Sequence, residues 1–443
     1  MGLKYVEHVK TAILWFLVVL SIFLTFSIWT YTPSYPTIQK APVVDISIAD
    51  RKRINEVVKP YKMVFSLKAG LSGTTSFPQV ERVLGVMKDW EIRNLSLVSN
   101  NLSPAELNEY SLTTNRFTMI YPTEIPFAVY DNIIPFTSTN IPGEGFDRMI
   151  VDWNRPEDDE LTVYFASSIS KQLYSAKVTK VDPQQFQEKV LMPAADFTKY
   201  THIHRNGQLS MFVPTEEIAS IRYTYILRNV PPTRFKDALF DNPNKVRRSF
   251  VGTYNEEYSD DTALLTVDSL DRTLSYVYPA AETDVPGIAH ELVFDSMDFV
   301  NEHEGWTDDY RLVGINPATQ KVDYQLFLLG YPVFSDMTST TISTYWGTNR
   351  IFRYIRPYYT LDLSLPSETD AAILPSGVEA AKLLEQVESV DEVKASGLTV
   401  GYYLTRDDER GLLNLEPSWF YLANGIWSRL TPETIGGGAF GLE

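Results

Sequence analysis

The stretch KTAILWFLVVLSIFLTFSIWTYTPSYP (residues 10–36) decides how the rest of the chain is organised. No charged residue or histidine lies between Lys10 and Lys40, and residues 12–29 are apolar apart from two serines and one threonine. As a helix these 18 residues extend roughly 27 Å, close to the hydrocarbon thickness of a bilayer. A core helix of a soluble protein is the alternative, but such a helix is rarely apolar on every side. We therefore expect a membrane-spanning helix.

A cleaved signal peptide and a lipid anchor are two further interpretations of this segment. A signal peptide ends in small residues at its cleavage site, whereas this stretch ends in bulky aromatics such as Trp29. Pro33 and Pro36 end the helix just beyond it, and the chain has no cysteine to carry a lipid. Lys4 and Lys10 favour a cytoplasmic amino terminus. We expect an uncleaved single-pass anchor in the cell membrane, with an extracytoplasmic body.

The composition of the chain limits its partners and its chemistry. Its 443 residues carry a formal net charge of −17, which argues against nucleic acid as a partner. Hydrophobic residues make up 44% of the chain and aromatic residues 13%, enough for well-packed cores. The absence of cysteine excludes disulfides, so burial alone must hold the body together.

Alternating helix and hairpin patterns predict an α+β protein of antiparallel sheets with packed helices, following one transmembrane helix. We predict four parts: a cytoplasmic stub and span at 1–36, and α+β domains at 37–228, 229–283 and 284–443. The sequence also predicts an extended Pro-rich spacer at residues 31–45 and a mobile tail at residues 436–443.

Local patterns predict individual helices, strands and turns. Helices are expected at 76–90, 181–190, 233–240, 284–305 and 374–387, the last with Ser376 and Glu379 as a capping box. Strands are expected at 116–121, 127–130, 161–166 and 221–227, with a pair of β-rich runs at 263–279 and a half-buried strand at 322–328. Residues 407–411 and Asn424–Gly425 read as turns between strands.

Histidine patterns give only weak metal signals. His202 and His204 form an H-x-H pair without a nearby third ligand, so we favour a surface strand or loop. The stretch HELVF begins at His290 like a zinc-protease helix but lacks the second histidine four residues on. His303 is thirteen residues away, too far for that spacing. We predict no metal site and no cofactor.

Catalytic motifs are equally weak. Ser168 and Lys171 have S-x-x-K spacing without the partner motifs that this chemistry needs. The acidic segments 259–262 and 406–410 read as β-turns, since they lack the ligand spacing of a calcium loop. We predict no catalytic residues and no enzyme. The alternative is an anchored wall hydrolase or transferase, which would need a deep cleft with paired, perturbed carboxylates.

Aromatic residues gather toward the carboxyl end of the chain. They are Trp346, Tyr354, Tyr358, Tyr359, Trp419, Tyr421 and Trp427. The favoured interpretation is the core of an α+β domain. The alternative is a ligand-binding sensor module with an aromatic platform for carbohydrate or peptide, which requires a well-formed pocket near Trp419 and Trp427.

Five stretches in the same order resemble the YycH family. They are NEHEGWTDDYRL (301–312), GYPVF (330–334), WGTNRIFRYIRP (346–357), LPSG (374–377) and LEPSWFYLANGIW (415–427). A short basic start, one span and a long outer region are also similar to that family. The resemblance implies a non-enzymatic accessory regulator of the WalK/WalR (YycG/YycF) two-component system, which controls cell-wall metabolism. It also implies that the spans contact the sensor histidine kinase and that a YycI-like membrane protein is a partner.

Helical spacing nominates the face of the span that contacts the kinase. It comprises Leu14, Leu17, Ser21, Thr25 and Ile28. Ser21 and Thr25 form a small-xxx-small pattern, which permits close approach of two helices. Alternatively, each hydroxyl bonds back to its own helix.

Overall fold

The computed structural model describes residues 3–30, 51–138, 140–157, 160–303, 305–365, 372–391, 395–423 and 426–431. The chain forms two compact units, Met1–Asp45 and Ile46–Glu443. The first contains helix α1 (Leu3–Thr30), whose side chains are described at His8, Lys10 and residues 13–25. Across the described residues, no helix qualifies as a membrane span by length and apolarity.

The second unit begins with a nine-stranded sheet in which every pairing of neighbouring strands is antiparallel. In spatial order its strands are β3 (Glu91–Ser99), β7 (Leu173–Thr179), β6 (Glu160–Ala166), β5 (Gly145–Glu157), β4 (Arg116–Pro126), β1 (Lys62–Leu67), β2 (Gly70–Thr74), β8 (Thr198–Ile203) and β9 (Met211–Pro214). The helices in this part are α2 (Ile54–Val57), α3 (Phe77–Met87), α4 (Pro104–Leu112), α5 (Phe127–Tyr130), α6 (Pro183–Phe186) and α7 (Met192–Ala194), with a π-helical turn at Gln187–Leu191.

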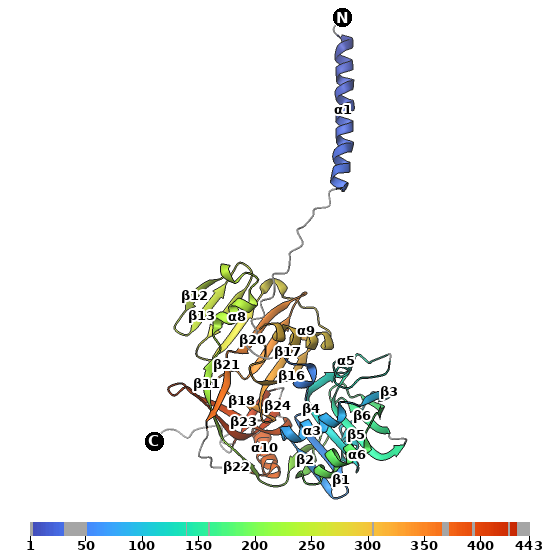
Figure 1. The fold of residues 1–443 in the computed structure, drawn as a ribbon, viewed down its shortest axis with the longest axis vertical. Coiled ribbons are helices and arrows are strands. Elements are labelled where there is room, and N and C mark those ends of the chain that lie inside the picture. The colour runs from blue at the N-terminus through green and yellow to red at the C-terminus, as the bar shows by residue number, and fades with distance from the viewer. Residues whose placement is uncertain are drawn as a thin grey trace. The chain divides into compact units, whose positions relative to one another are not determined.

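A larger sheet of 14 strands follows (Figure 1). In spatial order its path is β12 (Arg247–Val251), β13 (Asn255–Ser259), β14 (Leu264–Asp268), β15 (Thr273–Val277), β20 (Ile351–Pro357), β19 (Thr341–Trp346), β17 (Lys321–Leu328), β18 (Tyr331–Phe334), β23 (Ala395–Asp407), β24 (Leu412–Ala423), β11 (Tyr223–Asn229) and β21 (Tyr359–Leu365). Beside this path, β16 (Asp309–Asn316) pairs with β17, and β25 (Ile426–Leu430) pairs with β24. A two-stranded sheet joins β10 (Ile218–Ser220) to β22 (Ala372–Leu374).

Strand β18 is the seam of the large sheet. It pairs antiparallel with β17 on one side and parallel with β23 on the other. Gly401 on β23 permits this approach, because a Cβ there would lie 2.7 Å from the Pro332 carbonyl oxygen of β18. The two halves of the sheet therefore meet through a short strand and a residue without a side chain.

Helices in the second part of the body are few. They are α8 (Pro232–Leu239), α9 (Ala289–Glu302) and α10 (Gly377–Asp391), with 3-10 turns at Pro243–Lys245, Pro279–Ala281 and Pro317–Thr319. Helix α9 packs beside β16 and β17 (Figure 1). Helix α10 begins with the predicted capping box, in which Glu379 N donates to Ser376 Oγ at 3.3 Å and Ser376 N donates to Glu379 Oε2 at 2.9 Å.

The predicted α+β class with antiparallel sheets is confirmed. Helix α3 forms within the predicted range 76–90 and buries Val80, Val83 and Met87. The strand predicted at 127–130 is wrong, because these residues form the helical turn α5, in which Phe127, Val129 and Tyr130 are all buried. Strand β17 forms as predicted, but Gln325 and Phe327 are also buried because neighbours cover both faces.

One continuous hydrophobic core links the two large sheets, since it contains Phe65 of β1 and Tyr324 of β17. Strand β16 packs against β4, and Gly330 (φ +92°) leaves room for the Thr75 carbonyl oxygen, 2.6 Å from where a Cβ would stand. Strands β15 and β20 pair with each other although the predicted domain limit at 283/284 lies between them in the sequence. The proposed domain limits at 36/37, 228/229 and 283/284 stay predictions.

Candidate functional site

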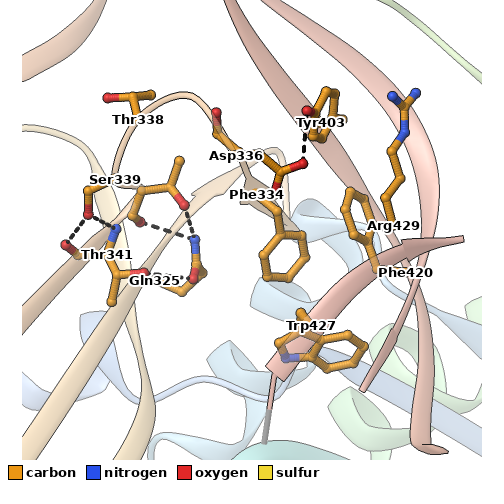
Figure 2. A pocket seen from close by; sticks show the side chains of 12 residues that line it. Gln325, Phe334, Asp336, Thr338, Ser339, Thr341, Tyr403, Phe420, Trp427 and Arg429 are labelled. Atoms are coloured by element: carbon orange, nitrogen blue, oxygen red, sulfur yellow. Dashed lines mark hydrogen bonds between the residues drawn. The ribbon is translucent and has the colours of Figure 1, made fainter. Parts of the chain in front are cut away.

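A cavity of about 230 Å³ lies beside the seam strand β18. Two walls form it: the segment 335–341 that follows β18, and one face of β23, β24 and β25 (Figure 2). The lining residues are Gln325, Phe334, Ser335, Asp336, Thr338, Ser339, Thr340, Thr341, Tyr403, Phe420, Trp427 and Arg429. We call this the seam pocket.

Hydroxyl groups dominate the first wall, and backbone contacts hold it in place. Thr338 Oγ1 donates to the Asp271 carbonyl oxygen at 2.6 Å. The hydroxyl of Tyr359, almost fully buried, donates to the Ser339 carbonyl oxygen at 2.8 Å. Gln325 Nε2 donates to Thr340 Oγ1 at 2.8 Å, and its Oε1 accepts from Thr341 Oγ1 at 3.1 Å. This wall is therefore organised by the protein itself.

Strand register places the second wall on one face of the sheet. Phe420 is paired with Arg429, and Trp427 lies two residues before Arg429, so all three side chains share a face. The ring of Phe334 lies 4.5 Å from Phe420 and 5.8 Å from Trp427, centroid to centroid. These rings line the aromatic side of the pocket, and Figure 2 shows Trp427 below Phe334 in this view.

Two charged side chains border the pocket, and both have partners in the protein. Tyr403 OH donates to Asp336 Oδ2 at 3.1 Å. Burial raises the pKa of Tyr403, and the hydrogen bond and charge of Asp336 raise it further, so the phenol stays a neutral donor. Arg429 Nη2 donates to Glu416 Oε2 at 2.9 Å, and its guanidinium lies 4.3 Å from the ring of Tyr403.

A buried lysine joins three strands near this region. Lys62 of β1 donates through Nζ to the carbonyl oxygens of Phe212 on β9 at 3.0 Å and Leu398 on β23 at 3.2 Å. Burial lowers the pKa of its ammonium to about 7, and the charge of Arg148 adds to the shift. Lys62 therefore links the nine-stranded sheet to the 14-stranded sheet through an amine that titrates near neutral pH.

A second polar cluster holds Lys52, near the beginning of the second unit, against the end of α9. Lys52 N donates to Asn301 Oδ1 at 2.9 Å, and Asn301 Nδ2 donates to the Lys52 carbonyl oxygen at 3.0 Å. Trp306 Nε1 donates to the same Asn301 Oδ1 at 2.7 Å, and Lys52 Nζ donates to the Asp308 carbonyl oxygen at 2.8 Å. The stretch 301–312 therefore binds the beginning of the body to the end of α9. We call this cluster the entry clamp.

The histidines considered in the sequence do not come together as a metal site among the described residues. His202 lies on β8 and His204 follows it, and both are exposed as predicted. His290 lies in the first turn of α9, while His303 Nδ1 lies 2.8 Å from the Phe299 carbonyl oxygen at its end. Within the described ranges, no three His, Cys, Asp or Glu side chains are placed to hold a metal ion.

Ser168, from the Ser-Lys spacing rejected as a catalytic motif, and Asp260, from an acidic segment expected to be a turn, both make local hydrogen bonds. Ser168 Oγ donates to Asp147 Oδ2 at 2.7 Å. Asp260 accepts from Thr262 N at 2.7 Å and closes the turn in 259–262. The turn at 407–411 lies between β23 and β24 as predicted, whereas Asn424–Gly425, the spacer 31–45 and the tail 436–443 lie outside the described residues.

Perturbed carboxyl groups lie away from the seam pocket. Burial raises the pKa of Asp308, whose Oδ1 accepts from Leu361 N at 3.1 Å and Thr360 Oγ1 at 3.1 Å. The pKa of Asp295 on α9 is raised by burial and by the neighbouring carboxylates of Glu291 and Asp298. Neither Asp295 nor Asp308 lines the pocket.

The C-terminal aromatic residues divide between two cores and the pocket. Trp346, Tyr354, Tyr358 and Tyr359 belong to the main core, while Trp419 and Tyr421 belong to a second core under α10. The core interpretation is therefore confirmed for these six. Trp427 lines the seam pocket with Asp336, Tyr403 and Arg429. No sequence motif pointed to Asp336, Tyr403 or Arg429 as site residues. The run of hydroxyl residues in SDMTSTT (335–341) was the available signal.

Helix α1 carries the predicted kinase-contacting face. The side chains of Leu14, Leu17, Ser21 and Thr25 are exposed, and that of Ile28 lies outside the described side chains. Thr25 Oγ1 donates to the Ser21 carbonyl oxygen at 2.8 Å, which is the back-bonded arrangement considered as the alternative. The hydroxyl oxygen of Thr25 can still accept a bond from a neighbouring helix. The contact itself stays a prediction.

The chain is an α+β protein in which hydroxyl groups and aromatic rings face one cavity. The family model for the YycH protein N-terminal domain matches residues 7–244, and that for the YycH protein C-terminal domain matches residues 208–434. The chain therefore belongs to the YycH family, and the resemblance carried by the five stretches is confirmed.

A curated relative and a solved structure agree with this assignment. The chain is 19% identical over 445 residues to the "Two-component system WalR/WalK regulatory protein YycH" of Bacillus subtilis (strain 168), covering 97% of each chain. It also matches the crystal structure of YycH from Bacillus subtilis with a TM-score of 0.73 and 17% identity, over 87% of this chain and 100% of that one. At this identity the structural match establishes the fold.

Proposed function

We propose that the chain is a non-enzymatic, membrane-anchored regulator of a sensor histidine kinase of WalK type. The observation that carries the proposal is the alignment with a WalR/WalK regulatory protein over 97% of both chains. The apolar stretch at residues 12–29 supports a single-pass anchor, with the body extracytoplasmic. Family membership also supports a YycI-like membrane protein as a second partner.

The anchor acts by contacting the spans of the kinase. Leu14, Leu17, Ser21, Thr25 and Ile28 form the contacting face. Small side chains at Ser21 and Thr25 let a neighbouring helix approach closely, as α1 leaves both exposed. A difference of about 1–2 kcal/mol in affinity for two kinase states changes their ratio severalfold, which is enough to regulate output.

The test replaces this face in the full-length chain at its normal expression level. The double variant Ser21→Leu, Thr25→Leu is expected to reduce both co-purification of the kinase and the change in kinase-dependent transcription. The matched control is Phe16→Leu, Phe23→Leu, which alters the opposite side of the helix, because successive residues turn by about 100°. Equal kinase association and output for the two double variants would refute the assignment of this face.

A second experiment separates the anchor from the body. Residues 1–40 alone are expressed in a strain that lacks the protein. Restored kinase regulation is expected if the span is the active contact. If the peptide is present in the membrane and no regulation is restored, the regulatory contact would be assigned to the body instead of the span.

A further inference from the structure

The seam pocket has polar groups suited to ligands that both donate and accept hydrogen bonds. Ser335 Oγ accepts from Met337 N at 3.1 Å, and Thr340 Oγ1 accepts from Gln325, so each hydroxyl hydrogen can point toward a ligand. Thr338 donates its own hydrogen to Asp271 and retains acceptor lone pairs. Hydroxyl groups of a ligand match this mixture, whereas an ammonium group only donates and a carboxylate only accepts.

The charges around the pocket disfavour an anionic ligand. Arg429 is the one cationic side chain among the lining residues, and it already binds Glu416 Oε2 at 2.9 Å and Ser418 Oγ at 2.7 Å. Asp336 adds a negative charge on the same rim. A phosphate or carboxylate would therefore meet the carboxylate of Asp336 and a guanidinium already paired with Glu416, so a neutral ligand is favoured.

The aromatic side of the pocket offers an apolar surface. The rings of Trp427 and Phe334 are partly exposed beside the hydroxyl wall (Figure 2), and the buried ring of Phe420 packs against Phe334. Aromatic rings bind apolar C–H faces with a large contact area and a small loss of side-chain freedom. A ligand with polar edges and apolar faces uses both walls at once.

We propose that the seam pocket binds one ring of a neutral carbohydrate. Its C–H face lies on the aromatic side, and its hydroxyl groups bond to the segment 335–341, including the carboxylate of Asp336. The cavity of about 230 Å³ corresponds to roughly seven or eight waters, the size of a single sugar ring. The first wall is held by Tyr359, Asp271 and Gln325 without any ligand, so little ordering is needed on binding.

The inference is tested by titrating the full-length chain with single sugars. The protein is kept in a detergent without a sugar headgroup, and binding is followed by saturation-transfer NMR and calorimetry. The probes are D-glucose and N-acetyl-D-glucosamine, each up to about 50 mM. Cyclohexanol, glycine and inorganic phosphate are the comparison ligands, because they represent an apolar ring, a zwitterion and an anion. A millimolar dissociation constant for at least one sugar, with weaker binding of all three comparison ligands, is expected.

Variants locate the binding to this pocket. Trp427→Ala is expected to weaken sugar binding about tenfold, because it removes a partly exposed ring that lines the pocket. Ile426→Ala is the matched control, since Ile426 is the preceding residue on β25 and is 67% exposed, with its side chain on the opposite face. Its sugar affinity is expected to change less than twofold. Asp336→Asn keeps the size of the side chain and tests the pocket independently if Trp427→Ala does not fold.

Three outcomes would overturn the inference. One is that neither sugar binds at the highest concentration. Another is that phosphate or glycine binds more tightly than both sugars. The third is that folded Trp427→Ala and Asp336→Asn retain the affinity of the unaltered chain.

Discussion

The buried amine of Lys62 makes the stability of the body depend on pH. Its pKa is lowered from 10.5 to about 7 in the folded protein, chiefly by burial. Between these two values the unfolded chain binds more protons than the folded chain, so the free energy of unfolding rises with pH. Below pH 7 the amine of Lys62 is protonated in both the folded and the unfolded chain. The full free-energy cost of burying its positive charge then lowers the stability of the folded state. At 1.36 kcal/mol per pKa unit, this penalty is about 5 kcal/mol at pH 6 and falls to about 2 kcal/mol at pH 9.

The assay compares the full-length chain with Lys62→Met by urea denaturation followed through tryptophan fluorescence. The variant loses the bonds to Phe212 and Leu398, a cost that is independent of pH. We expect the free energy of unfolding of Lys62→Met, minus that of the unaltered chain, to be about 3 kcal/mol larger at pH 6 than at pH 9. Lys59→Met is the control, because Lys59 is similarly buried but paired with Glu81 at 2.9 Å. A difference for Lys62→Met that stays constant from pH 6 to pH 9 would refute the reasoning.

Three further substitutions test other parts of the body by the same denaturation assay. Gly401→Ala is expected to destabilise the folded chain by about 1–3 kcal/mol, because its methyl group would overlap the Pro332 carbonyl oxygen; an unchanged midpoint would contradict the described seam. Ser376→Ala removes the cap of α10 and is expected to cost about 1 kcal/mol, whereas Ser376→Thr should lose less. Asn301→Ala breaks the entry clamp at a cost of about 2–4 kcal/mol, with faster amide exchange at Lys52; unaltered exchange there would count against the clamp.

Local chemistry made several elements of this fold predictable. The capping box before α10 and the apolar spacing of α3 involve residues three or four positions apart, so their signals lie within one short stretch. The stretch 127–130 resembles a buried strand in sequence, because four apolar residues have no clear period. Burial on several sides suits a helical turn equally well, and only the tertiary surroundings select α5.

The seam pocket could not be predicted, because its walls are distant in sequence. Val333 of β18 pairs with Tyr402 of β23, and nothing local specifies that parallel pairing. The hydrogen bond between Tyr403 and Asp336 gave no signal either, since the two residues meet only after the strands are in place. The aromatic residues near the carboxyl end were noticed in the sequence. Separating Trp427 from the core residue Trp419, however, required the register of β24 and β25.

The pairing of early and late strands also has a consequence for the order of events during synthesis. Strand β11 at residues 223–229 pairs with β24 at 412–423, and Lys62 bonds to Leu398. Contacts that span so much sequence form slowly, and a chain emerging from its amino end must wait for them. Until residues 395–423 are available, β11 and β18 lack their partners β24 and β23 and present open edges to other chains. Protection by a chaperone or a neighbouring protein during this interval would be most valuable at those edges.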